Sequence, residues 1–309
     1  MSLIKLRFAI YIKSLIILIT SSNSLGFVLQ HEHQSNHRIT WELMSQGTGA
    51  SKSRWKNPPF LALITEPDAC DSLGRLNETY QAIEQATING GVDLVVVRIS
   101  EDTNSNLSSI EEVNANKWEL LQRLSQLKIM REESDKGFKL IVNNDIDMAI
   151  NALSNDLAID GMHVKERHIE SIPSVRQQLQ RAAKQVDKSI TIGTSCHCLE
   201  SAMQTYQFTD YLFVGTCYTT KSHPEKSVDE LEGPNLPGTI KRCLSECCGD
   251  SSPIIFAIGG IDETNCYEPV LFGADGVGVI RSVMQAEDPG DMVEQIRQYM
   301  KSSIEKREV

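Results

Sequence analysis

Short apolar runs alternate with longer amphipathic stretches along the chain from Phe60 onward. Runs of this length, apolar at nearly every position, are typical of strands that are buried on both faces of a parallel sheet. The stretches between them have the spacing of helices that cover such a sheet. The pattern predicts strands at 60–64, 93–98, 138–143, 158–164, 189–193, 210–215, 253–258 and 275–280, and helices that include 76–89, 110–131, 175–186 and 288–301.

This alternation predicts an α/β protein with a (β/α)8 TIM barrel as its single domain, over residues 58–309. Eight strand–helix units in about 250 residues match the usual size of such a barrel. A doubly wound open sheet is the alternative, but the first strand is followed by LITEPDAC and not by G-x-G-x-x-G. In a barrel the reacting groups lie at the carboxyl ends of the strands, where side chains distant in sequence meet.

The first 57 residues predict an N-terminal targeting extension. Residues 1–24 place basic residues around an apolar stretch that is too short to span a bilayer, which resembles a secretory signal. Residues 25–57 carry few acids and are typical of a transit segment or a linker. Together they resemble the two-part address of plastid proteins in algae with secondary plastids, and secretion is the alternative. We expect no membrane segment in the mature form.

Charge and cysteine content narrow the function classes. The net charge of −11 argues against nucleic-acid binding, because no basic face is available to neutralise phosphates. Any anion site is therefore expected to be local. The eight cysteines show no repeated C-x-x-C spacing and predict free thiols in a reduced compartment, with neither a disulfide framework nor a zinc site.

The last two predicted strands end in residues that are suited to contact an anion. PIIFAIGGI ends in Gly259 and Gly260, and GADGVGVIRS contains Ile280 and Arg281. In (β/α)8 barrels, N–H groups of the seventh and eighth loops and a following helix N-terminus hold phosphate. Glycine has no Cβ to stand between backbone and ligand. The alternative is two buried strands with glycines that serve only turns.

The ordered series FKLIVNNDIDMAI, AIDGMHV, ITIGTSCH, DYLFVG, AIGGI and GADGVGVI resembles the thiamine phosphate synthase/TenI superfamily over residues 60–300, and is most similar to TenI-like domains. The resemblance implies a barrel of thiamine metabolism whose partner is a phosphorylated thiazole or thiamine phosphate. Strand-end position and resemblance together predict these substrate or phosphate contacts: Arg98, Asn143, Ser195, Thr220, Ser222, His223, Gly259, Gly260, Ile280 and Arg281.

The synthases of this superfamily join a pyrimidine diphosphate to a thiazole phosphate, with Mg²⁺ on carboxylates and with cationic side chains at the leaving group. This chain departs from their pattern where Asn144 and His168 replace the two metal carboxylates. A neutral amide binds Mg²⁺ poorly, because this hard cation prefers anionic oxygen.

Two lysines of the synthase pattern are also missing: its Gln-x-Arg-x-Lys reads Val96, Arg98 and Ser100 here, and its Thr-x-Thr-Lys run reads Thr220-Lys221-Ser222-His223. Asp145 is the nearest replacement for a lost metal ligand, and Lys221 for one lost lysine. No metal ligand is assigned, and Mg²⁺ is expected only if synthase activity is retained.

Three functions stay open from the sequence. The first is a tautomerase-like enzyme that moves a proton on a thiazole phosphate without metal, with His197 as the general acid/base. The second is thiamine phosphate synthase with an altered metal site. The third is a protein that binds a phosphorylated ligand without catalysis. His163 is predicted to be a buried histidine. The polar stretch 100–116 is predicted to be a lid over the site or a disordered segment. The sequence leaves open whether the protein forms a homo-oligomer.

Overall fold

The computed structural model describes residues 55, 57–89, 91–98, 110–183, 189–220 and 227–307. Lys52–Val309 forms one compact unit. The predicted targeting extension falls outside the described residues except for Trp55 and Asn57, so that the plastid address stays a prediction. Lys221, Ser222 and His223 also lie outside the described residues.

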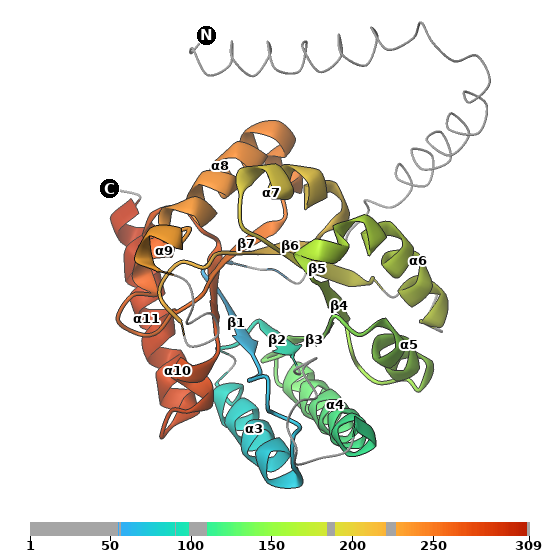
Figure 1. Cartoon of the computed structure of the whole chain (residues 1–309). Helices are drawn as coiled ribbons and strands as arrows, with labels where there is room; N and C mark the ends of the chain where they lie inside the picture. The colour runs from blue at the N-terminus through green and yellow to red at the C-terminus, as the bar shows by residue number, and fades with distance from the viewer. Residues whose placement is uncertain are drawn as a thin grey trace, which may run out of the picture. The chain divides into compact units, whose positions relative to one another are not determined.

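Eight parallel strands close into a barrel in the order of the chain, which confirms the predicted fold class (Figure 1). Each strand pairs with the next one, and β8 pairs with β1. The strands are β1 (Phe60–Ile64), β2 (Leu94–Val97), β3 (Lys139–Asn143), β4 (Gly161–Val164), β5 (Thr191–Cys196), β6 (Tyr211–Val214), β7 (Ile254–Ile258) and β8 (Gly276–Val279).

Helices surround the barrel on its outer face (Figure 1). They are α3 (Leu73–Ala86), α4 (Ile110–Glu133), α5 (Ile146–Ser154), α6 (Ile172–Ala182), α7 (Leu199–Thr205), α8 (Asn235–Cys248), α9 (Tyr267–Leu271), α10 (Arg281–Met284) and α11 (Pro289–Arg307), with short 3₁₀ turns at Glu166–Ser171, Tyr206–Phe208, Val228–Glu230 and Gly249–Ser251. Within the described ranges, no helix combines the length and apolar character that a membrane span requires.

Several predicted boundaries differ from the structure, and two of the differences have identifiable reasons. The first helix begins at Leu73, before the predicted residue 76, because the Ser72 side chain accepts the N–H of Arg75 and caps it. Residues 110–116 belong to α4, where Glu111 and Glu112 favour the positive end of the helix dipole. This part of the predicted lid or disordered stretch is therefore helical, and residues 99–109 lie outside the described ranges.

Alternate residues of the strands fill the inside of the barrel and the layer between barrel and helices. Along β1, Leu61 and Leu63 join the outer core, because successive side chains of a strand point to opposite faces. The alternating residues of β1 pack inside the barrel with aromatic rings from β6 and β7. This inner cluster includes Phe60, Ala62, Ile64, Tyr211, Phe213 and Phe256. The barrel is thus a filled core whose free volume lies at one end.

An aspartate stands immediately before each even-numbered strand and ties the amino ends of the barrel together. Its carboxylate accepts the N–H of the second residue in the preceding strand, at 2.7–2.9 Å. A cation from an outer helix pairs with each carboxylate. The four pairs are Asp93 with Arg297, Asp160 with Lys128, Asp210 with Arg176, and Asp275 with Lys241. These contacts fix the strand register and so the positions of the strand ends.

Trp55 covers the amino end of the barrel, although it lies in the segment that the sequence predicts as transit or linker. Its ring centroid lies 5.3 Å from that of Phe60 and 5.9 Å from that of Phe256, with edge contacts. The Lys139 Nζ lies 5.5 Å from the Trp55 ring centroid. The residues just before β1 therefore belong to the packed barrel.

We expect Trp55→Ala to lower the free energy of unfolding by about 2 kcal/mol, because it removes aromatic packing from the barrel base. Urea denaturation of the full chain, followed by circular dichroism, measures the change. Tyr299→Ala, at a half-exposed aromatic residue of α11, is the control and should change stability little. Equal stability of the Trp55 variant and the natural chain would contradict the packing role.

All eight cysteines are free thiols, as the sequence predicts. Burial raises the pKa of the thiols of Cys70, Cys196, Cys217 and Cys266 to about 12. A thiol with so high a pKa stays protonated at neutral pH and is a poor nucleophile. Cys196 and Cys217, although close to the strand ends, therefore act as packing residues.

Candidate active site

A cavity of about 950 Å³ opens at the carboxyl ends of the strands. Every strand contributes to its wall through a residue in the strand or directly after it: Ile64, Arg98, Asn143, His163, Ser195, Phe213, Ile258 and Gly278. This is the end of a (β/α)8 barrel where chemistry is expected. The cavity is therefore the candidate active site.

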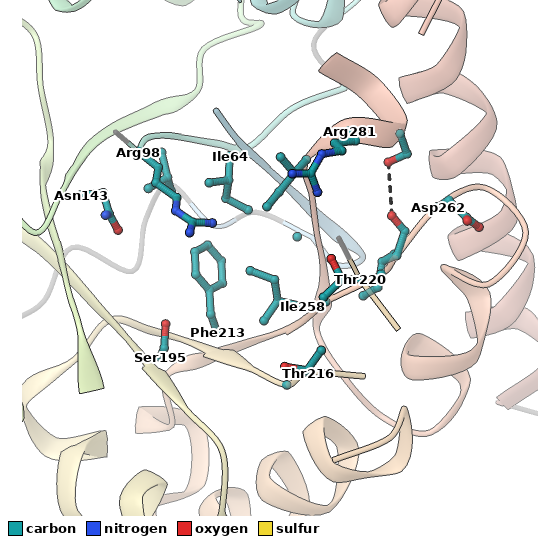
Figure 2. Close-up of a pocket in the computed structure, with 18 of the residues that line it drawn as sticks. Ile64, Arg98, Asn143, Ser195, Phe213, Thr216, Thr220, Ile258, Asp262 and Arg281 are labelled. Carbon is teal, nitrogen blue, oxygen red and sulfur yellow. Dashed lines mark hydrogen bonds between the residues drawn. The ribbon is translucent and has the colours of Figure 1, made fainter. Parts of the chain in front are cut away.

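The cavity has an apolar floor between two arginines. Figure 2 shows Ile64, Phe213 and Ile258 at the centre, with the side chains of Arg98 and Arg281 on opposite sides. An apolar floor favours a flat ring, and the arginines favour anionic groups. The arrangement suits a ligand, or two ligands together, with an aromatic middle and negative ends.

All the predicted site residues that the structure describes line this one cavity. Asn144 and His168, the positions of the lost metal ligands, do not line it. The residues brought together are Arg98, Asn143, Ser195, His197, Thr220, Gly259, Gly260, Ile280 and Arg281.

Gly259 and Gly260 have the left-handed backbone angles φ 99° and 65°, which favour glycine. A Cβ on Gly260 would lie 2.3 Å from the Thr219 carbonyl oxygen, and one on Gly259 would lie 2.7 Å from Cγ2 of Thr216. The expectation that a ligand approaches the backbone closely at these glycines stays a prediction. The loop after β6 fills the space that each Cβ would take, and the glycines let the two loops pack together at the cavity wall.

Side-chain hydrogen bonds hold the loop after β7 in this shape. The Asn265 amide nitrogen donates to the Gly260 carbonyl at 2.9 Å, and Asn265 Oδ1 accepts the N–H of Asp262 at 3.0 Å. The Gly260 carbonyl thus faces Asn265. A fixed loop of this kind presents its backbone to a ligand without further ordering, which favours binding.

Arg281 stands at the start of α10 and is held by a buried carboxylate. Its Nε lies 3.2 Å from Glu66 Oε1. Glu66 also accepts from Gln285 Nε2 at 2.7 Å and pairs with Arg75 at 3.1 Å. The N–H groups of Val283 and Met284 bond to the Ile280 carbonyl, whereas those of Arg281 and Ser282 precede the first hydrogen bonds of this short helix and have no acceptor inside it. The loop after β8 is thus suited to an anion.

His163 is buried beneath the cavity and anchors Ser195. Its Nε2 lies 3.0 Å from Ser195 Oγ, and its Nδ1 lies 3.2 Å from the Tyr211 hydroxyl. Gly193 makes this possible, because a Cβ there would overlap the Tyr211 ring. Burial and the charge of Arg98 lower the pKa of His163 to about 3, so that the imidazole is neutral at working pH. It is both a buried histidine, as predicted, and part of the cavity wall.

His197 lies between two carboxylates at the cavity rim. Its Nδ1 is 3.2 Å from Glu232 Oε1, and its Nε2 is 3.7 Å from Glu166 Oε2. Glu232 also accepts the N–H of Thr216. A general base needs a ring nitrogen directed at the substrate, whereas both nitrogens of His197 face acids of the protein. This geometry favours a structural role in holding the loops after β5 and β6.

Several charged residues that line the cavity were not predicted from the sequence, among them those directly after β4. Lys165, Glu166 and Arg167 all line the cavity. The signal was their position at a strand end, where a barrel places its site residues.

The strand ends around β3 and β4 do not fit the magnesium site that the synthase pattern implies. Asn144 Oδ1 accepts the N–H of Lys165 at 3.3 Å, and the exposed His168 accepts from Arg167 Nε at 3.1 Å. Asp145, the expected replacement ligand, contacts other groups of the protein. Its side chain caps α5 by accepting the N–H of Met148 at 2.9 Å, and it pairs with Lys117. In the described ranges, His, Cys, Asp and Glu side chains form no group of three that could hold a metal ion.

A family model described as thiamine monophosphate synthase (TMP-TENI) matches residues 61–283. The chain belongs to this family. A thiamine-phosphate synthase of Clostridium acetobutylicum is 29% identical over 214 residues, which cover 68% of this chain and 82% of that protein. The one of Chloroflexus aurantiacus is 27% identical over 246 residues, which cover 79% of this chain and 94% of that protein.

A thiamine phosphate pyrophosphorylase of Pyrococcus furiosus shares the fold, with a TM-score of 0.54 and 23% identity over 79% of this chain and 96% of that one. The family match confirms the resemblance found in the sequence and identifies the chain as a member of an enzyme family of thiamine biosynthesis. Which reaction this member carries out depends on the residues of the cavity.

Proposed function

We propose that the protein is a thiamine-phosphate synthase, which joins a pyrimidine diphosphate to a thiazole phosphate and releases pyrophosphate. The observation that carries the proposal is the apolar floor between Arg98 and Arg281, because two flat heterocycles with anionic groups at opposite ends match it. The relatives named thiamine-phosphate synthase support this reaction better than the tautomerase that the sequence analysis puts first.

In this proposal the thiazole phosphate lies on the side of β7 and β8. The loop after β7, which contains Gly260, and the first turn of α10 offer N–H groups to its phosphate. Arg281 adds a positive charge that the ion pair with Glu66 holds in place. The pyrimidine lies over Phe213, with Ser195 as a polar contact oriented by His163. Its diphosphate points to Arg98.

The reaction requires that the negative charge on the leaving diphosphate is stabilised and that the two rings are aligned. The diphosphate leaves with the electron pair of the bond that breaks, and the thiazole nitrogen supplies the pair for the new bond. Since no proton has to be removed to form that bond, the neutral His163 and the acid-bound His197 are consistent with the reaction. Fixed cations near the leaving oxygens stabilise the developing charge, and the walls align the two rings.

The experiment is an assay of the full chain with both substrates. We expect thiamine phosphate and pyrophosphate to form in equal amounts, and neither to form when one substrate is left out. Conversion of the thiazole phosphate to its tautomer without ligation would support the tautomerase instead. Binding of thiamine phosphate without any turnover would support the non-catalytic alternative.

We expect His197→Gln to keep kcat/KM for ligation within about threefold of the natural chain, because His197 contacts acids of the protein and takes no part in bond formation. A tautomerase that relied on His197 would lose on the order of 100-fold or more in this variant. Steady-state kinetics on both proteins distinguishes the two. His168→Gln, outside the cavity, is the matched control.

A further inference from the structure

We propose that the diphosphate of the pyrimidine substrate is bound by Arg98, Lys165 and Arg167, in place of Mg²⁺ held on carboxylates, and that this binding does not depend on a divalent cation. The identity of the diphosphate rests on the proposed function. The site lies at the ends of β2 and β4, across the floor from Arg281.

The barrel places these cations close together. Strands β2, β3 and β4 are neighbours in the barrel. Arg98 directly follows β2, and Lys165 directly follows β4. Neighbouring strands lie about 4.8 Å apart, so the ends of β2 and β4 are roughly 10 Å apart. The register sets Asn143 beside His163, and both line the cavity between the two cations. Long arginine and lysine side chains can therefore contact one diphosphate from two sides.

The carboxylate of Glu166 is directed away from the neighbouring cations Lys165 and Arg167. Glu166 lies between Lys165 and Arg167 in the sequence. Its Oε1 accepts from Ser201 Oγ on α7 at 2.5 Å, and its Oε2 faces His197. These contacts direct the carboxylate toward β5 and α7. The carboxylate of Glu166 thus has partners of its own in α7 and at His197.

The charge balance supports the same assignment. In the synthase pattern, two carboxylates and one Mg²⁺ sum to zero, and here the two positions hold the neutral amide of Asn144 and His168. A site without the carboxylates and without the metal has the same total charge. Lys165 and Arg167 then supply the positive charge that stabilises a polyanion, and guanidinium groups bind phosphate oxygens in pairs.

Isothermal titration with inorganic pyrophosphate tests the proposal on the full chain. We expect binding in EDTA to be no weaker than in millimolar Mg²⁺, and binding in the double variant Lys165→Gln/Arg167→Gln to be weaker on the order of 100-fold or more, since two charge-assisted contacts are lost. The control is Arg181→Gln/Lys301→Gln, which removes two exposed cations outside the cavity and should bind as the natural chain does. Equal melting temperatures show that the variants are folded.

Binding of pyrophosphate that requires Mg²⁺, or that is unchanged in the Lys165/Arg167 variant, would overturn the proposal. The assay with both substrates separates this outcome from failure of the proposed function. Ligation that runs only with Mg²⁺ would refute the cation site and leave the synthase function standing. Metal-independent pyrophosphate binding without ligation would refute the function and leave the cation site standing.

Discussion

Gly260→Ala is expected to reduce kcat/KM for thiamine phosphate formation on the order of 100-fold, because it disrupts the loop that offers backbone N–H groups to the thiazole phosphate. The new Cβ would lie 2.3 Å from the Thr219 carbonyl oxygen. The residue also has φ 65°, which alanine adopts at a cost. Both effects push the loop after β7 away from the loop after β6. Steady-state kinetics with the thiazole phosphate as the varied substrate measures the loss.

Gly233→Ala is the matched control for this variant. Gly233 has a similar φ of 74°, but a Cβ there would meet nothing within 4 Å. Gly233→Ala therefore causes backbone strain but no steric overlap with a neighbouring loop. We expect it to lose about 1 kcal/mol in stability and to keep an activity near that of the natural chain. If Gly260→Ala kept full activity, or if both variants lost it equally, the packed-loop account of the phosphate site would be wrong.

Arg281→Gln is expected to weaken binding of thiamine phosphate about 100-fold, since a fixed guanidinium beside a phosphate contributes roughly 1.5–3 kcal/mol. The ion pair with Glu66 holds the guanidinium in place before the ligand arrives, so little side-chain freedom is lost on binding. Isothermal titration with thiamine phosphate measures the change directly, independent of turnover.

Arg75→Gln separates the ligand contact from damage to the Glu66 cluster. Arg75 also pairs with Glu66, at 3.1 Å, but it does not line the cavity. Each variant therefore removes one cation from the same buried carboxylate. We expect the Arg75 variant to bind thiamine phosphate normally, and a similar loss of affinity in both variants would show that Arg281 acts only through the fold.

The barrel could be predicted from the sequence because its strands are apolar at nearly every position, as in DLVVVR and DYLFVG. The starts of these runs carry a second signal, because Asp93, Asp160, Asp210 and Asp275 each stand directly before a strand. Their hydrogen bonds to the preceding strand define the amino end of the barrel. A repeated acid at strand starts is visible in a sequence, but the helix cations that pair with it come from distant segments.

The site was predictable in position more than in detail. Strand-end reasoning brought Arg98, Ser195 and Arg281 to one cavity, because parallel strands all end at the same side. It did not show which way a side chain turns. His197 faces two acids and Asp145 faces Lys117, and both contacts depend on residues more than 25 positions away. Such partners follow from the packed loops and not from local pattern.

The measurement that tests the central claim most directly is a crystal structure of the full chain with thiamine phosphate. We predict that the phosphate contacts the backbone of Gly260 and the first turn of α10, with the Arg281 guanidinium in hydrogen-bond reach and the pyrimidine over Phe213. A phosphate bound instead at Lys165 and Arg167, or thiamine phosphate bound outside the cavity, would contradict the account.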